Sequence, residues 1–173
     1  MFTPIQQAHF NDWANRRIYS CCEKLSEEQL ELNRNAFFNS IAGTLNHLLL
    51  VDILYMDRLK GQPSRFKKLN ERVGHSFKEI KTLQVTQDAE YVNYFSNFEI
   101  DNLEKEVCFK TLLANSELWR VPMRIYLANL FQHQVHHRGQ IHNLLSQANL
   151  DPPPIGFVEF AIEHQLIPSP IIS

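Results

Sequence analysis

The segment over residues 40–61 constrains the fold more than any other part of the chain. Its apolar residues recur at steps of three and four, which predicts an α-helix, and Ser40 and Gly61 are typical of the two ends of a helix. Between Leu49 and Leu54 this helix would be apolar on almost every side. We therefore expect it to be buried among other helices and to form the interface of a homodimer.

Helix signals recur along the rest of the chain. Thr3 and Pro4 mark the start of a helix that ends near residue 24, and Pro122 opens a long helix that ends before the three prolines at 152–154. We also expect a turn of helix after Ser26, a loop over 62–85, a helix over 87–98, a hairpin over 104–121 that turns at 114–116, and a short helix over 156–165. The sequence thus predicts one all-α domain over residues 1–173, a four-helix bundle with a short extra helix and a small hairpin.

Composition argues against several classes of function. The 173 residues carry a formal net charge of -2 and scattered basic residues, which argues against a nucleic-acid partner. No apolar run approaches the roughly 20 residues that span a bilayer, so we expect no membrane segment. The chain contains no glycine-rich phosphate loop and no nucleophile elbow. The adjacent Cys21 and Cys22, with a third cysteine, are typical of free thiols and predict a cytoplasmic protein.

Histidine is the main chemical resource of this sequence, which contains eight. His133 and His137 are four residues apart in the helix that follows Pro122, so both imidazoles lie on one face and can reach one ion. The apolar residues spaced around them turn that face toward the core. A pair with this spacing also arises by chance among eight histidines, so the spacing alone does not establish a metal site.

His47 lies in the most apolar part of the chain. A buried imidazole needs a partner, which here is either a backbone carbonyl of the core or a shared metal ion. Three neutral imidazoles would suit Zn²⁺, Ni²⁺, Cu²⁺ or Fe²⁺, and three protein ligands leave coordination positions open, as in reactive sites. We therefore predict a metal site made of His47, His133 and His137, and we assign no catalytic or cofactor-binding residue.

The other candidates are weaker. Four histidines are expected to be solvated or to support the site: His75, His136, His142 and His164. His9 could face the interior of the bundle from the first helix, but we do not expect it to be a ligand. Arg138 and Gln140 flank the predicted pair. Their side chains either make surface or structural hydrogen bonds, or hold a loop or a substrate anion near the site.

Several segments resemble the DinB family of metal-binding proteins. Its two signatures are similar to Ile41-Ala42-Gly43-Thr44-Leu45-Asn46-His47 and to Gln132-His133-Gln134-Val135-His136-His137-Arg138-Gly139-Gln140. Its first-helix pattern resembles Phe10-Asn11-Asp12-Trp13-Ala14-Asn15, and its closing segment resembles Pro154-Ile155-Gly156-Phe157-Val158. The likeness spans nearly the whole chain and is poorest over residues 62–85, which could shape a substrate pocket differently.

The resemblance implies a fold and an activity. The fold is an up-down-down-up bundle, often dimeric, with a metal held by His47, His133 and His137. Characterised relatives are similar to transferases and isomerases that use a low-molecular-weight thiol such as bacillithiol or mycothiol. The implied function is a transferase in detoxification or stress response that acts on a small-molecule substrate and depends on zinc, nickel or iron.

Two alternatives stay open at this point. Metal-assisted hydrolysis would need a carboxylate as general base near the open face of the metal, and no spacing in the sequence places one there. A metal-binding dimer without catalysis would need a fourth protein ligand and no cavity. In each case histidine ligation predicts that the metal leaves as the pH falls below about 6.5.

Overall fold

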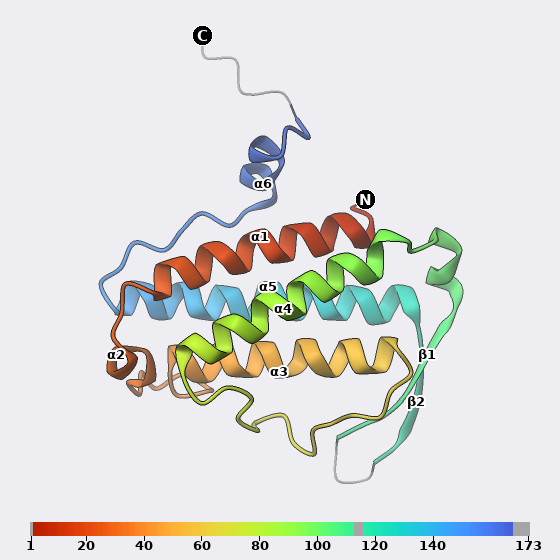
Figure 1. Cartoon of the computed structure of the whole chain (residues 1–173), viewed down its shortest axis with the longest axis horizontal. Coiled ribbons are helices and arrows are strands. Elements are labelled where there is room, and N and C mark those ends of the chain that lie inside the picture. Colours follow the sequence, from red (N-terminus) through yellow and green to blue (C-terminus); the bar gives the residue numbers. More distant parts are fainter. Residues whose placement is uncertain (1, 113–115, 168–173) are drawn as a thin grey trace.

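The computed structural model describes residues 2–112 and 116–167, and most of this part of the chain is helical (Figure 1). The elements are α1 (Pro4–Cys22), α2 (Glu27–Glu31), α3 (Ile41–Leu59), α4 (Phe77–Ser96), the 3-10 turn η1 (Ile100–Glu104), β1 (Glu106–Lys110), β2 (Leu118–Pro122), α5 (Met123–Gln147) and α6 (Phe157–Glu163). The predicted helical class is confirmed. No helix in the described ranges is long and apolar enough to cross a membrane.

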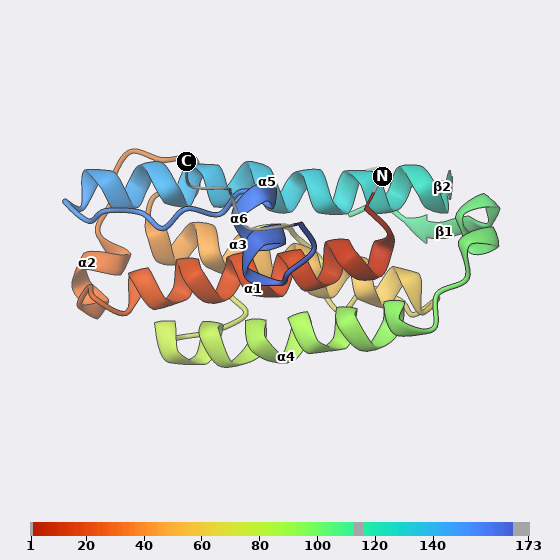
Figure 2. The same cartoon turned by 90° about the horizontal axis from the view of Figure 1, so that it is seen from above.

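Four long helices form the body of the protein. Helix α1 packs against α4 and α5, and α3 packs against the same two helices. Figures 1 and 2 show α1 and α5 running in one direction and α3 and α4 in the other. This arrangement encloses a core in which the apolar side chains of α3 meet those of the other three helices.

Side-chain caps explain where the helices begin. Thr3 forms a reciprocal capping box with Gln6 at the start of α1, and the hydroxyl of Ser40 accepts a hydrogen bond from the backbone N–H of Gly43 at 2.9 Å. Ser76 caps α4 in the same way. Helix α4 therefore begins ten residues before the expected position, and the prediction of a loop over residues 77–85 was wrong. The first half of α4 is mostly polar, which hides its helical period in the sequence.

Helix α3 is buried within its own chain. Every residue from Ile41 to Asp57 except Gly43 is buried by other parts of the same molecule. The apolar surface that suggested a dimer is thus already covered by α4, α5 and the neighbouring elements. A homodimer through this helix stays a prediction, without the exposed apolar face on which it was based.

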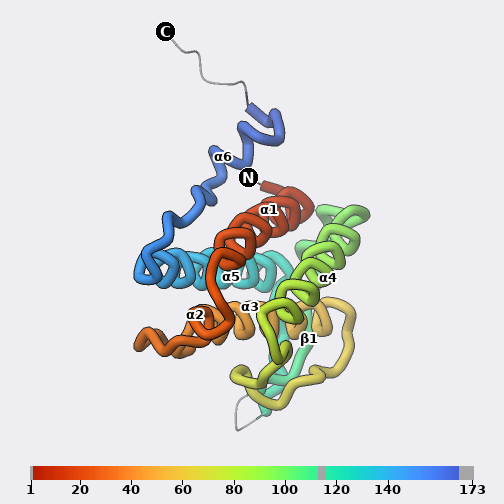
Figure 3. Tube along the Cα trace, turned by 60° about the vertical axis from the view of Figure 1, so that its left-hand side comes forward, coloured from red at the N-terminus to blue at the C-terminus, as the bar shows by residue number. Residues whose placement is uncertain are grey.

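The hairpin and the last helix lie at the margins of the helical body. Strands β1 and β2 pair antiparallel and form the expected hairpin, and its register places Val107 opposite Val121. Of the expected turn, residues 114 and 115 lie outside the described residues. Figures 1 and 3 show α6 on the outer side of α1, away from α3 and α4. There Phe160 is buried against Phe10 and Trp13.

A cluster of buried polar side chains links all four long helices. It contains Asn11, Asn15, Asp52, Gln84, Asp88, Gln134 and Arg138. The Arg138 guanidinium donates to the side-chain oxygens of Asn11 and Asn15, and both amide groups donate to the carboxylate of Asp88. Amides thus connect a buried guanidinium to a buried carboxyl group. The side chain of Arg138 therefore makes structural hydrogen bonds, which was one of the two expectations for it.

Candidate metal centre

The structure brings the three predicted histidines together. His47 comes from the second turn of α3, and His133 and His137 come from the middle of α5. The Nε2 atom of His133 lies 3.3 Å from Nε2 of His47 and 3.0 Å from Nε2 of His137. His47 and His137 are buried and His133 is half-buried. In the part of the chain that the structure describes, these are the residues grouped closely enough to hold a metal ion.

Hydrogen bonds on the outer ring nitrogens set the tautomers of two histidines. The Nδ1 atom of His47 lies 3.0 Å from the carbonyl oxygen of Leu69, and Nδ1 of His137 lies 2.8 Å from Oε1 of Gln140. Both oxygens can only accept, so each Nδ1 carries the proton and each Nε2 carries a lone pair. Two lone pairs therefore point at His133, whose single proton can satisfy at most one of them.

A metal ion resolves this arrangement. Three imidazole nitrogens at 2.0–2.1 Å from one tetrahedral ion lie about 3.3 Å apart, which is close to the two Nε2 separations. The Leu69 carbonyl and the Gln140 amide hold their histidines as outer partners commonly hold the ligands of a metal. The donor set therefore fits a divalent transition metal with open coordination positions.

Asn46 explains how His47 acquires its outer partner. Its side-chain amide donates to the carbonyl of Glu71 at 2.8 Å, and its oxygen accepts from the backbone N–H groups of Val73 and Gly74. These bonds hold the segment between α3 and α4 against the start of α3. The carbonyl of Leu69, in the same segment, is thereby placed beside the ring of His47.

Gly43 is required because the backbone of the preceding loop, at Phe38, comes very close to position 43. A Cβ atom at this position would lie 2.1 Å from the carbonyl oxygen of Phe38, so any larger residue would push the preceding loop away. The loop packs the ring of Phe38 on His47, with the two ring centroids 4.0 Å apart, and against the edge of His137. Gly43 thus supports an apolar wall over two of the three histidines.

Burial lowers the pKa of all three imidazoles. It brings the pKa of His133 to about 3, with a further contribution from the neighbouring histidines. It brings the pKa of His137 to about 4, although the bond to Gln140 acts in the opposite direction. The pKa of His47 is lowered for the same reason. All three rings are therefore neutral at pH 7, which is the form that binds metal.

Because these pKa values are low, we expect acid to displace a bound metal at a pH below the usual pKa of histidine. Protons compete for the folded ligands only near pH 4, so the metal should stay bound at pH 6 and leave as the pH falls through roughly 4. The unfolded chain takes up protons at about 6.5, so stability that is present above that pH is lost as the pH falls toward 4. Metal analysis after dialysis between pH 8 and 3, with circular dichroism in parallel, checks this. Loss of half the metal at pH 6.5 from folded protein would contradict it.

Two cavities reach the histidine cluster. One of about 490 Å³ lies between α3, α5 and the hairpin, and its wall includes His47 and His133. The other, of about 640 Å³, also reaches His47, and its wall combines the polar side chains of Asn39, Asn70 and Arg72 with Phe37, Phe38 and Leu69. Neither wall contains an aspartate or glutamate among the residues that the structure describes.

The structure places four of the five weaker histidine candidates away from the site. His9, His75, His136 and His164 are exposed, and His142 contacts the carbonyl of Pro153 at 3.1 Å. Of this group, His136 stays near the cluster, because its Nε2 lies 3.1 Å from the amide nitrogen of Gln140.

Sequence reasoning identified neither Leu69 nor Phe38 as part of the site. Leu69 acts through its backbone carbonyl, and Phe38 stacks from a loop. Neither role leaves a periodic signal in the sequence. The available clue to the role of Leu69 was Asn46, which directly precedes His47 in the sequence.

Comparison with known proteins identifies the family of this chain. The profile of the DinB family matches residues 1–165. A curated relative, Protein DinB of Bacillus subtilis (strain 168), is 22% identical over 154 residues, which cover 86% of this chain and 87% of that protein. The match includes His47, His133 and His137 within a single span that contains all four long helices. The chain belongs to the DinB family.

Proposed function

We propose that this protein is a metal-dependent transferase that joins a low-molecular-weight thiol to an electrophilic small molecule. The observation that carries the proposal is the meeting of two separate cavities at His47, within a cluster of three neutral imidazoles. A transfer reaction needs room for two organic substrates beside the reacting centre. The ligand set suits zinc, nickel or iron, the metals that the family resemblance implies.

The residues of the chain have definable roles in such a reaction. When bound, the metal would lower the pKa of a coordinated thiol, so that the thiol reacts as the nucleophilic thiolate. His47, His133 and His137 would hold the ion, and Leu69 and Gln140 would fix two of the rings. The thiol would lose its proton to solvent, a sulfur–carbon bond would form, and the leaving group would depart with its electron pair. Phe38 would keep water from one side of the cluster.

The site supports this reaction better than the two alternatives. Hydrolysis would need a general base, and no described residue lining either cavity is a carboxylate. A purely structural metal would take a fourth protein ligand, whereas the described residues contribute three. Thiol transfer needs neither feature.

The arrangement of the helices supports the finer assignment of the fold. The directions of α1, α3, α4 and α5 are those of the up-down-down-up bundle that the family resemblance implies (Figure 1). We include this bundle in the proposal, together with a role in detoxification or stress response.

Loading the purified protein with zinc, nickel or ferrous iron tests the proposed activity. Each form is incubated with glutathione, bacillithiol or mycothiol and a panel of alkyl halides, epoxides and 1-chloro-2,4-dinitrobenzene, and conjugates are measured by mass spectrometry. We expect at least one pair to react well above the rate without protein. The His137→Ala variant should show only the background rate, and His9→Ala, which alters an exposed histidine, should match the wild type.

The outcomes separate the three readings of the site. Absence of conjugation with every thiol would contradict the transferase. Hydrolysis of esters or amides without added thiol would instead favour a metal-dependent hydrolase. Metal binding with neither reaction would favour a protein without catalytic activity.

A further inference from the structure

The cavity of about 490 Å³ is a groove that follows one face of α3 and one face of α5. On α3 it is lined at helical spacing by His47, Val51, Leu54, Tyr55 and Arg58. On α5 its wall contains Ile125, Tyr126, Asn129 and His133. Phe109, Trp119 and Val121 of the hairpin add to the wall. The groove thus joins the histidine cluster at one end to Arg58 at the other.

The walls of the groove are mostly apolar and aromatic between these two ends. Val51 and Leu54 of α3 face it together with Phe109 and Trp119 of the hairpin. Such a wall suits the body of an apolar molecule better than a sugar or a peptide, which would bring polar groups without partners. It therefore suits the electrophilic substrate and not a polar thiol. The second cavity at His47 has a mixed wall in which Asn39, Asn70 and Arg72 offer polar partners beside Phe37 and Phe38, so it is the better place for the thiol.

Arg58 supplies a positive charge at the far end of the groove. No acidic residue lies within ion-pair distance of its guanidinium in the described parts of the chain, and no acidic residue lines the groove there. Its Nη2 donates to the carbonyl of Lys110 at 3.3 Å, and the guanidinium carbon lies 4.0 Å from the centroid of the Phe109 ring. These contacts hold the group in place and leave its Nε without a hydrogen-bond partner among the described residues.

Two tyrosines share this end of the groove. Burial raises the pKa of both Tyr55 and Tyr126, and the positive charge of Arg58 offsets part of this rise. Both phenols therefore lie in the field of the guanidinium. The hydroxyl of Tyr55 accepts a hydrogen bond from the amide of Asn129. The hydroxyl of Tyr126 donates to the backbone carbonyl of Tyr55 at 3.4 Å, so the proton of the Tyr55 hydroxyl is the one left for an anion at Arg58.

We propose, on the basis of the function proposed above, that the electrophilic substrate is an organic acid with an elongated apolar or aromatic body. Its acidic group pairs with Arg58, and its reactive end reaches the histidine cluster. His47 and Arg58 are eleven residues apart on α3, so their backbone positions are separated by about 16 Å along the helix axis, which guides the choice of probe length. A twelve-carbon acid is close to this length.

Binding of dodecanoate and of dodecan-1-ol tests the proposal. The two probes have the same chain and differ in charge, and each is measured by displacement of the fluorescent apolar dye N-phenyl-1-naphthylamine. In the wild type we expect the acid to bind roughly tenfold more tightly than the alcohol, because a hydrogen bond to a charged group is stronger than one to a neutral group. Equal affinities of acid and alcohol for the wild-type protein would overturn the proposal without any mutation.

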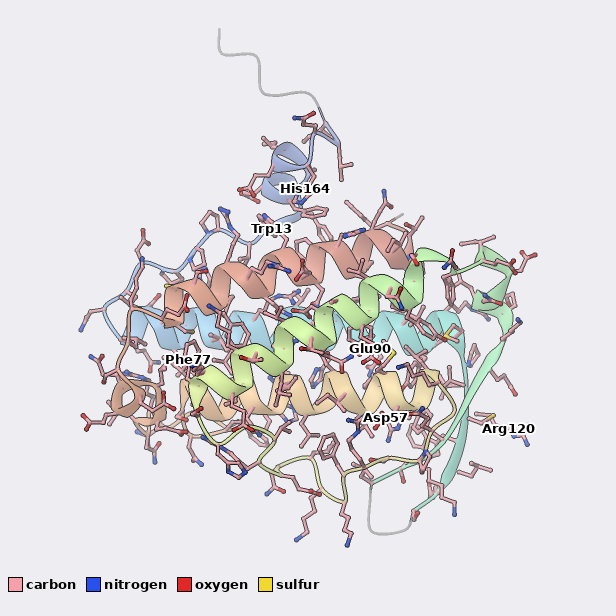
Figure 4. All side chains as sticks on the ribbon, viewed as in Figure 1. Trp13, Asp57, Phe77, Glu90, Arg120 and His164 are labelled. Atoms are coloured by element: carbon pink, nitrogen blue, oxygen red, sulfur yellow. The ribbon has the colours of Figure 1, made fainter. Side chains whose placement is uncertain are left out.

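Variants at Arg58 assign the preference to one side chain. Arg58→Met should abolish the preference for the acid and leave the affinity for the alcohol nearly unchanged. Arg58→Lys should keep most of the preference for the acid. Arg120→Met is the matched control, because Arg120 is also a cation but does not line the groove. It lies on β2 of the neighbouring hairpin, with a side chain that is 68% exposed (Figure 4). If Arg120→Met removes the preference as Arg58→Met does, the general charge of this end explains the result, and the proposal fails.

The same titrations with and without bound zinc separate this proposal from the proposed function. A carboxylate can also coordinate a metal, so a preference that survives in Arg58→Met and disappears when zinc is removed would overturn the role of Arg58. If the preference for the acid depends on Arg58 both with and without zinc, the role of Arg58 is supported, even if no thiol conjugation is found. Conjugation with equal binding of acid and alcohol would support the transferase and contradict the acidic substrate.

Discussion

Replacing His137 with alanine should reduce the bound metal from about one ion per chain to a trace. His137 supplies one of three ligand nitrogens, and its Nε2 lies 3.0 Å from that of His133. Structural zinc sites with four ligands are worth roughly 10–16 kcal/mol, so one ligand accounts for about 3 kcal/mol, or on the order of a hundredfold in affinity. Elemental analysis of the purified protein and titration against a competing chelator measure the change.

The variant His9→Ala is the control for this measurement. His9 is exposed on α1, and its removal should leave the metal content and affinity unchanged. The alanine at position 137 should also leave the fold intact, because the core of the four long helices does not depend on this side chain. Full metal content in folded His137→Ala protein would show that the ion binds elsewhere.

Helical geometry alone predicted part of this site. The spacing of His133 and His137 placed two rings on one face of a helix, and the apolar surroundings of His47 placed a third ring in the core. The structure brings the three together. The outer partners could not be predicted in this way, because the carbonyl of Leu69 reaches His47 across 22 residues through a segment with no regular period.

The limits of the fold prediction have a similar cause. The start of α4 was missed because Phe77, Ile80 and Gln84 alternate with exposed polar residues, so the apolar period is weak. The sequence did contain a signal for the buried polar cluster. Asp52 interrupts the most apolar run of the chain at a position on the buried face of the helix, and such a residue needs a polar partner from another helix. Which helix provides it depends on tertiary packing.

Replacing Arg138 with methionine should reduce the free energy of unfolding by about 3–5 kcal/mol. Arg138 is 2% exposed, and its guanidinium is the cation of the buried cluster that also contains Asp52 and Asp88. Methionine fills a similar volume but leaves both carboxyl groups without a positive charge nearby. It also removes the donor that Asn11 and Asn15 share. Urea unfolding of metal-free protein, followed by circular dichroism, measures this loss separately from any change in metal binding.

Arg124→Met provides the matched comparison on the same helix. Arg124 is a cation near the start of α5 that pairs with Glu104 at 2.5 Å, and its side chain is 51% exposed. Removal of an exposed ion pair should cost less than about 1 kcal/mol. If the two substitutions have the same effect, Arg138 makes no special contribution to the packing of the four helices.

The effect of Arg138→Met should also grow with pH. Burial raises the pKa of Asp88 to about 7, against the opposing effects of its hydrogen bonds and of Arg138. For a carboxyl group with a raised pKa, stability is fully present below its unfolded value of about 3.9 and is lost as the pH rises through 7. Without Arg138 the ionised form of Asp88 is less favourable still, so the wild type and the variant should differ more at pH 8 than at pH 5. A difference that is the same at both values would mean that the guanidinium stabilises the core through its packing and not through its charge.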